Sequence, residues 1–444
     1  MKTSPRAKCL PQSALFKTLA ILLIMGFYCL DYFYRISTGL IVPELMTHYN
    51  VSPAGIGFFA SAFYLGYVLF QIPGGYLIDK FPLQKTIAIF VMICSLTFLG
   101  FIYSHHFYLG VLWRFLLGLG SALSFVSVLH VARHTLHQRY FGLISGLTIA
   151  IGTLTGSLIQ VYIAHAIQYW SWQTCLALSA LPSFSIAFLF LLPFFKSVNT
   201  PLISAKTKPM QPIQSLLQLS RQRGFILNAI IGGLFYLPTS ILAAAWGVSL
   251  FTLSYHLSRT DSAFCLTLLF AGWSLGSPII GYLNDHFFNY RLTISICALA
   301  ASIVSIIMII LPQWVNHAVY TLAFLVGLFS SAQVSVWNVF NKLCPPHING
   351  IGIALTNMII TLSAALFHVL EGFLITYYST IKSHSNLSNA GLLHGLWIIP
   401  GLFMISALLS QFLPQPASKK NLAEREGFEP SVRVNVHTLS RRAP

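Results

Sequence analysis

Two oppositely charged residues, Asp31 and Arg35, interrupt the first long apolar run of the chain. Four residues apart in a helix, they lie about one turn apart on the same face. A charge at membrane depth costs about 2.5–3.5 kcal/mol on insertion scales, so such residues face a cavity or a partner. Asp31 can exchange a proton, while Arg35 can hold a substrate carboxylate or control the ionisation of Asp31. The alternative is an ion pair that only stabilises the helix bundle.

A second buried cation is predicted at Arg114, inside the apolar stretch 113–121. A fixed guanidinium can bind a carboxylate through two parallel hydrogen bonds. The alternative is that Arg114 extends along the helix to the outer membrane surface.

Uncharged polar and aromatic residues at helical spacing add further candidates. Tyr32 lies beside the first ion pair, and Tyr64, Tyr67 and Gln71 share one face of the second apolar run. The candidates in the second half of the chain are Tyr236, Trp246, Gln333 and Asn338. They can hydrogen-bond a solute whose charge the first half neutralises, or they can simply pack between helices. Glu371 is expected to reach the headgroups from the outer end of its apolar run.

Metal and cofactor chemistry has little support. His130, His134 and His137 resemble one histidine box, but membrane iron enzymes of that kind need several converging boxes. The seven cysteines are scattered and mostly in apolar runs, as small core residues are. No Walker-type phosphate loop occurs, which argues against direct use of ATP. We predict no metal, no cofactor and no enzymatic activity, with a membrane-embedded metal enzyme as the remote alternative.

The composition requires a bilayer. Of the 444 residues, 56% are hydrophobic and 8% charged, which leaves too little polar surface for a soluble globule of this size. The net charge of +16 does not indicate nucleic-acid binding, because the basic residues lie between apolar runs instead of on one face of a soluble fold.

About twelve apolar runs are long enough to cross some 30 Å of hydrocarbon. They are 15–37, 54–78, 87–103, 107–131, 140–166, 172–195, 225–251, 262–283, 292–311, 318–339, 351–378 and 392–413. With the N-terminus inside, every Lys and Arg between the runs falls on the inner side except Arg259 and Lys382. The positive-inside rule therefore predicts that both termini are cytoplasmic.

The chain divides into two halves of six spans. We predict an N-terminal bundle at 1–195, a basic, proline-containing cytoplasmic linker at 196–224, a C-terminal bundle at 225–413, and a disordered cytoplasmic tail at 414–444. Two bundles joined by a linker suit a transporter whose halves rock about a central site.

A short motif recurs in each half. The sequence 75–86 ends one apolar run, forms a charged turn and begins another, and 281–293 repeats its Gly-Tyr-Leu-x-Asp core. This recurrence indicates internal duplication. So short a turn makes the flanking helices antiparallel, and we expect Gly75 to allow close approach of helix backbones.

The first copy of this motif resembles the signature between the second and third helices of the major facilitator superfamily. The resemblance implies gating roles for Gly75, Asp79 and Lys80, and for Asp285 and Arg291 in the second copy. The stretches 35–75, 113–121 and 235–248 are similar to the organic-anion symporters and the phagosomal nutrient transporters of that superfamily, many of which carry amino acids.

The sequence thus predicts an all-α membrane protein with two pseudo-symmetric six-helix bundles. We expect a monomeric secondary active transporter of the bacterial inner membrane that moves a small organic anion or amino acid, with proton symport. On this interpretation Arg35 and Arg114 bind the carboxylate and Asp31 couples the proton. An uncoupled facilitator or an exporter of the same fold is the alternative.

Overall fold

The computed structural model describes residues 14–135, 141–192, 212–286, 289–310, 318–345, 348–383 and 387–414, and every regular element in these ranges is helical. The N-terminal half contains α1 (Ala14–Leu40), α2 (Val42–Tyr49), α3 (Pro53–Lys80), α4 (Leu83–Tyr103), α5 (Phe107–Ser121), α6 (Leu123–Thr135), α7 (Phe141–Ala166), α8 (Trp172–Ser179) and α9 (Leu181–Leu191). The C-terminal half contains α10 (Pro212–Ser220), α11 (Arg223–Ile241), the π-helix η3 (Leu242–Trp246), α12 (Gly247–Tyr255), α13 (Arg259–His286), α14 (Tyr290–Ile310), α15 (Val319–Ser330), the 3₁₀ turn η4 (Ser331–Gln333), α16 (Val334–Leu343), α17 (Asn349–Ser383), α18 (Asn389–Gly395) and α19 (Ile398–Ser410).

The prediction of an all-helical membrane protein is confirmed. Eleven segments of the described residues are long and apolar enough to cross a membrane. The remaining predicted span is α1, whose 27 residues are also sufficient in length. Its charged residues, Asp31 and Arg35, lower its mean hydropathy. The same two residues are the first candidates for the functional site.

Helices are packed closely in each bundle because glycines remove side chains at the crossings. In the N-terminal half, a Cβ on Gly66 or Gly118 would come within 2.0 Å of a backbone carbonyl oxygen of the partner helix, α5 or α3. In the C-terminal half, Gly272 and Gly327 make the equivalent crossing between α13 and α15, where a Cβ would come within 2.1 Å of a carbonyl oxygen. The same device at matching places is structural support for the internal duplication.

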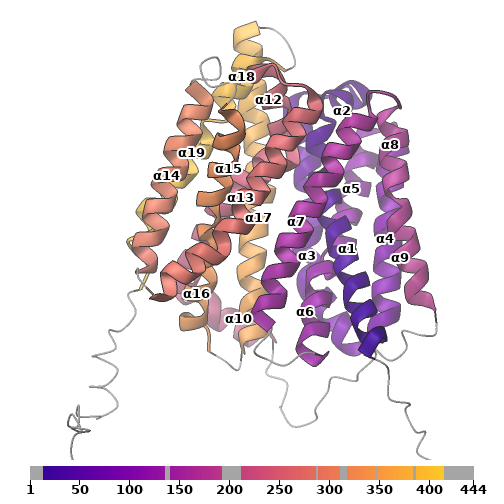
Figure 1. Ribbon diagram of the computed structural model, residues 1–444, viewed down its shortest axis with the longest axis vertical. Coiled ribbons are helices and arrows are strands. Elements are labelled where there is room, and N and C mark those ends of the chain that lie inside the picture. Colours follow the sequence, from indigo (N-terminus) through magenta and orange to yellow (C-terminus); the bar gives the residue numbers. More distant parts are fainter. Residues whose placement is uncertain are drawn as a thin grey trace, which may run out of the picture.

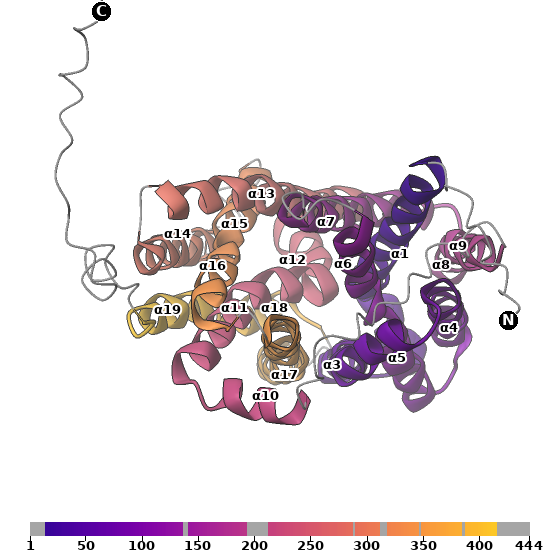
Figure 2. The same ribbon diagram turned by 90° about the horizontal axis from the view of Figure 1, so that it is seen from below.

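The two halves lie side by side, with the long helices of both running roughly along the vertical axis of Figure 1. Seen along that axis, α3 packs against α17 and α7 packs against α13 where the halves meet (Figure 2). We call the end of the molecule that carries α2 the α2 end, and the opposite end, with the 75–86 and 281–293 turns, the motif end. The predicted linker is described only from residue 212, where α10 begins, and the predicted tail from 415 onward lies outside the described residues.

Candidate functional site

Asp31 and Arg35 lie between the two halves, fully enclosed by helices. The Asp31 side chain has no exposed surface and Arg35 is 7% exposed. Arg35 Nη2 contacts Asp31 Oδ2 at 3.3 Å, and Ser124 Oγ donates a hydrogen bond to the same oxygen at 2.8 Å. Asp31 Oδ1 has no hydrogen-bond partner. The predicted pair therefore forms, and one carboxylate oxygen is left free.

Arg35 joins the N-terminal half to the C-terminal half. Its Nη1 donates a hydrogen bond to Tyr236 Oη on α11 at 3.1 Å. The guanidinium carbon lies 4.7 Å from the ring centre of Tyr67, 5.4 Å from Tyr32 and 5.9 Å from Tyr64, within cation–π range. Arg35 Nε has no partner. We call Asp31, Arg35, Tyr32, Tyr64, Tyr67 and Tyr236 the central cluster; the structure brings together six of the residues predicted from the sequence.

Arg114 lies next to the central cluster but is held by the backbone of α1. Its two terminal nitrogens donate to the carbonyl oxygens of Tyr34 and Arg35 at 2.6 and 2.8 Å. The side chain is 1% exposed, which excludes the alternative that it extends to the membrane surface. Arg114 therefore fixes the part of α1 that presents Arg35, and only its Nε is unpaired. Its predicted direct contact with a carboxylate stays a prediction.

A second hydrogen-bonded link crosses between the halves. Tyr64 Oη on α3 and Ser240 Oγ on α11 are 2.8 Å apart, and Ser240 Oγ is 3.0 Å from His368 Nε2 on α17. The Tyr64 and His368 rings also stack, with centres 5.1 Å apart. Relative movement of the two halves must break this chain of contacts.

The other predicted binding residues lie away from the central cluster. Gln71 is buried one turn beyond Tyr67, and both its amide atoms lack a partner. Gln333 donates to the carbonyl oxygen of Gly232 at 2.9 Å, and Asn338 Nδ2 is buried without a partner. Trp246 is fully buried in the π-helix η3. Their participation in binding remains a prediction.

His368 and Glu371 are the buried titratable residues that the sequence interpretation missed. Glu371 was expected to reach the headgroups, but its side chain has no exposed surface, and neither carboxyl oxygen has a hydrogen-bond partner. That expectation is wrong because neighbouring helices cover Glu371; His368 and Gly372, on either side of it along α17, pack against α3. The sequence feature that could have identified this pair is the spacing of His368 and Glu371, two titratable residues three positions apart in an otherwise apolar helix.

The α2 end of the molecule is closed by contacts between the halves. A Cβ on Gly57 of α3 would lie 2.2 Å from the carbonyl oxygen of His368, and the amide of Ala54 donates to Thr376 Oγ1 at 2.8 Å. Glu44 of α2 and Arg259 of α13 form an ion pair at 2.5 Å. These contacts separate the central cluster from the solvent at this end.

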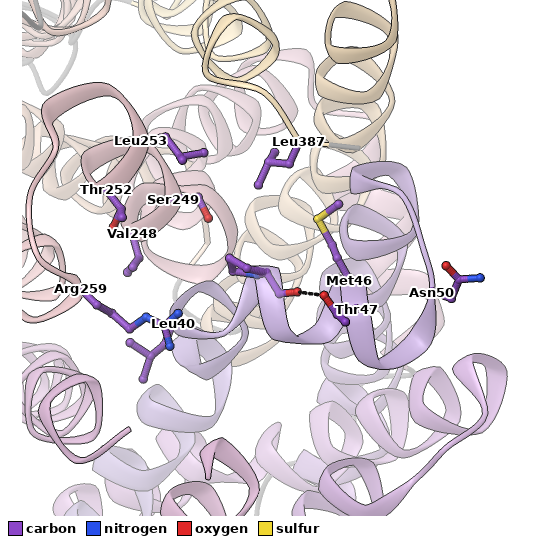
Figure 3. A pocket seen from close by; sticks show the side chains of 11 residues that line it. Leu40, Met46, Thr47, Asn50, Val248, Ser249, Thr252, Leu253, Arg259 and Leu387 are labelled. Atoms are coloured by element: carbon purple, nitrogen blue, oxygen red, sulfur yellow. Dashed lines mark hydrogen bonds between the residues drawn. The ribbon is translucent and has the colours of Figure 1, made fainter. Parts of the chain in front are cut away.

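A cavity of about 490 Å³ lies above that closure. Figure 3 shows Leu40, Met46 and Thr47 from the N-terminal half facing Val248, Ser249 and Leu253 from α12, with Arg259 at the margin. The cavity is a vestibule at the α2 end and does not include the central cluster.

At the motif end, the expected close approach at Gly75 is wrong for this conformation. A Cβ at Gly75, or at its counterpart Gly281, would meet no atom within 4 Å. Lys80 is exposed and lies near the rings of Tyr76 and Phe81. Arg291 donates through Nη2 to the carbonyl oxygen of Leu413. The side chains of Asp79 and Asp285 lie outside the described part of the structure, so their gating roles stay predictions.

The histidine cluster at 130–137 is described only at His130, since the side chains of His134 and His137 fall outside the described residues. Within the described side chains, no group of three His, Cys, Asp or Glu residues is arranged to hold a metal ion.

An all-helical chain with two bundles around a buried, charged and aromatic centre has the architecture of a membrane transporter. The family model of the Major Facilitator Superfamily matches residues 21–368 and also 229–443. The chain therefore belongs to this superfamily, and the relatives described next are transporters, not enzymes.

Solved structures of transporters share the fold. A bacterial homologue of the human lysosomal transporter Spinster, inward-facing and unoccupied, superposes with a TM-score of 0.75 at 13% identity and covers 90% of this chain and 98% of that chain. The nucleoside transporter NupG gives a TM-score of 0.71 at 13% identity, covering 90% and 99%. A D-xylose–proton symporter gives 0.70 at 14% identity, covering 91% and 99%. These TM-scores establish the shared fold. Sequence identities this low do not indicate which substrate the chain carries.

One curated relative is similar in sequence. The probable sulfoacetate transporter SauU of Cupriavidus necator is 23% identical over 177 residues. The match spans 39% of this chain and 41% of that protein, so the chain covers less than half of the relative's length.

Proposed function

We propose that this protein is a proton-coupled secondary transporter of a small organic anion, working by alternating access. The observation that supports this most directly is the charge of the buried centre. Arg35 and Arg114 contribute two guanidinium groups, while Asp31 is the only carboxylate bonded to either of them among the described residues.

An excess of positive charge in a low-dielectric site is costly unless a counter-charge enters it. An anionic substrate supplies that counter-charge, whereas a neutral sugar or a nucleoside does not. The unpaired Nε of Arg35 and its neighbouring Nη groups form the planar donor set that binds carboxylate or sulfonate oxygens. The similarity to a probable sulfoacetate transporter is consistent with an organic anion of this kind. A neutral amino acid is a zwitterion with no net charge and leaves the excess charge uncompensated, whereas an acidic one such as glutamate carries one net negative charge and counts among the organic anions.

Proton coupling is proposed to act through Asp31. When Asp31 takes up a proton, its attraction for Arg35 weakens, and Arg35 becomes free to bind the substrate. The oxygen Asp31 Oδ1 has no partner and is available to accept that proton. Proton and anion are then bound in the same state, which is the condition for symport.

In this scheme Tyr32, Tyr64, Tyr67 and Tyr236 enclose Arg35 and hydrogen-bond the solute as the halves move. Trp246, Gln71, Gln333 and Asn338 are proposed to line the pathway beyond the central cluster. Arg114 holds α1 in place while the α2 end is closed and contacts the substrate only if α1 shifts.

The proposed orientation places the motif end in the cytoplasm of a bacterium and the α2 end in the periplasm, with both termini cytoplasmic. The transporter is proposed to act as a monomer in the inner membrane. In the opposite conformation the motif end closes, the open space at Gly75 and Gly281 is filled, and Asp79, Lys80, Asp285 and Arg291 stabilise the closed state.

Uptake into proteoliposomes tests this function. The panel is radiolabelled sulfoacetate, malonate, succinate and glutamate, with xylose as the neutral control. With an acidic exterior, we expect at least one dianion or sulfonate to accumulate above equilibrium, and a protonophore to abolish accumulation. Arg35→Gln should lose uptake, whereas Arg221→Gln, which removes an exposed cation in the turn after α10, should keep it. Equilibration without accumulation would identify an uncoupled facilitator, and uptake of xylose alone would refute the proposal.

A further inference from the structure

Glu371 occupies an environment that an ionised carboxylate does not tolerate. Its side chain has no exposed surface, and both carboxyl oxygens lack a hydrogen-bond partner. It also forms no ion pair with a described residue. Burying an unpaired carboxylate is far more costly than burying a neutral carboxylic acid. In the closed conformation of the α2 end, Glu371 is therefore stable as the acid.

A polar group of the C-terminal half is placed beside Glu371. The indole of Trp246 is close enough to interact with the Glu371 carboxyl group, although its Nε1 does not reach hydrogen-bond geometry and is otherwise unpartnered. Trp246 ends the π-helix η3, and single π-helical turns frequently mark functional sites. Two unpartnered buried polar groups side by side form a built site, because packing alone would favour apolar residues here.

His368 lies one turn before Glu371 on the same side of α17. Its Nε2 contacts Ser240, but its Nδ1 is buried and has no partner. From α3, Tyr64 stacks on the imidazole, and from α5 the charge of Arg114 acts on it. Among the described residues these are the groups that face the pair.

The pair is located at the contact that closes the α2 end. The carbonyl oxygen of His368 is the atom that a Cβ on Gly57 would strike, and Gly372 next to Glu371 is packed on the first turn of α3. When α3 and α17 separate, water from the vestibule at the α2 end reaches this part of α17.

We propose that Glu371, with His368, is a second proton-binding site that controls the closure of the α2 end. With a proton on a Glu371 oxygen, the α2 end closes. When the halves separate, the O–H bond breaks, the proton passes to water or to His368 Nδ1, and the hydrated carboxylate keeps the α2 end open. The inference deepens the proposed function, on which it rests, because it assigns a second proton site to the same transport cycle.

The protonation of Glu371 can be measured without any substrate. Infrared difference spectra of the reconstituted protein between acidic and alkaline pH should contain the C=O stretch of a buried carboxylic acid. That signal should disappear in Glu371→Gln and persist in Asp31→Asn. Trp246→Phe keeps the carboxyl group but removes the indole N–H, so it should shift the frequency of the signal. A spectrum unchanged by both Glu371→Gln and Trp246→Phe would overturn the proposal.

The link to closure needs a conformational readout. Spin labels on Thr47→Cys and Leu253→Cys, across the vestibule, report the separation of the halves in a background whose native cysteines are replaced by alanine. The wild-type distance distribution should shift to longer values as pH rises. In Glu371→Gln the distance between the labels should stay short at all pH values. Asp261 is an exposed acid at the same end, so Asp261→Asn should behave as wild type. A wild-type pH response in Glu371→Gln would refute the control of closure. Both readouts are independent of transport, so failure of uptake with an intact carboxyl signal would refute the proposed function alone.

Discussion

The α2 end can close as it does because residue 57 of α3 is a glycine, which has no Cβ. A Cβ at Gly57 would lie 2.2 Å from the carbonyl oxygen of His368, and real Cβ atoms essentially never come within 3.0 Å of another atom there. The clash is with backbone, so no side-chain rotation relieves it. In Gly57→Ala, α3 and α17 must therefore separate by about 0.8 Å, the difference between these two distances.

The free-energy cost of separating α3 and α17 can be estimated from the packing that is lost. A gap of about 0.5–1 Å already forfeits a quarter to a half of the dispersion energy between the facing atoms. Overpacking of this kind costs about 1–3 kcal/mol, which shifts a two-state equilibrium by about 5- to 150-fold. Ala also favours the helix by about 1 kcal/mol over Gly, and that gain must be controlled for.

Gly401→Ala is the control, because it also replaces a helical glycine, its Cβ would meet nothing within 4 Å, and it lies on α19, outside both the α3–α17 contact and the motif end. The assay is the distance between spin labels on Thr47→Cys and Leu253→Cys. Gly57→Ala should raise the population with separated halves by the stated factor, while Gly401→Ala leaves the distribution unchanged. Equal distributions in wild type and Gly57→Ala, or an equal shift in both variants, would refute the assignment of α3 and α17 as the closing contact.

Three further predictions follow from the contacts of the charged residues. Asp31→Asn should lose proton-driven accumulation of an anion but keep exchange of labelled for unlabelled anion; unchanged accumulation would reject Asp31 as the coupling residue. Arg114→Met removes two charge-assisted hydrogen bonds to α1, each worth about 1.5–3 kcal/mol, so thermal unfolding in detergent should occur at a clearly lower temperature, and a wild-type midpoint would contradict its positioning role. Glu44→Gln breaks a pair whose side chains are 21% and 28% exposed, so it should cost less than about 1 kcal/mol and change uptake rates less than about fivefold; a larger loss would mean that the pair with Arg259 is essential for closure.

The transmembrane pattern could be predicted because the bilayer imposes a length on each apolar run. The central cluster could be predicted for a related reason. Charges at membrane depth are costly, so Asp31 and Arg35 had to find partners, and aromatic residues at helical spacing on α3 were the available ones. Tyr64, Tyr67 and Tyr236 are all in contact with Arg35 or its neighbours.

Other features depend on distances that the sequence does not contain. Glu371 was assigned to the membrane surface because the predicted span ended at 378, whereas α17 continues to Ser383. The burial of the Glu371 carboxyl group comes from packing between helices, above all the contact of α17 with α3, which the sequence does not show. Arg114 satisfies α1 carbonyl groups instead of remaining free for a ligand, which requires knowledge of how α5 crosses α1. The motif glycine shows no close contact because packing there depends on which end of the transporter is closed.

The central claim is that an organic anion and a proton enter together through the site of Asp31 and Arg35. The most direct measurement is the luminal pH of proteoliposomes, reported by a trapped dye, after the transported anion is added outside without an imposed gradient. Symport predicts acidification of the lumen that follows anion entry, and its loss in Arg35→Gln. Entry of the anion without acidification, or with alkalinisation of the lumen, would contradict the account.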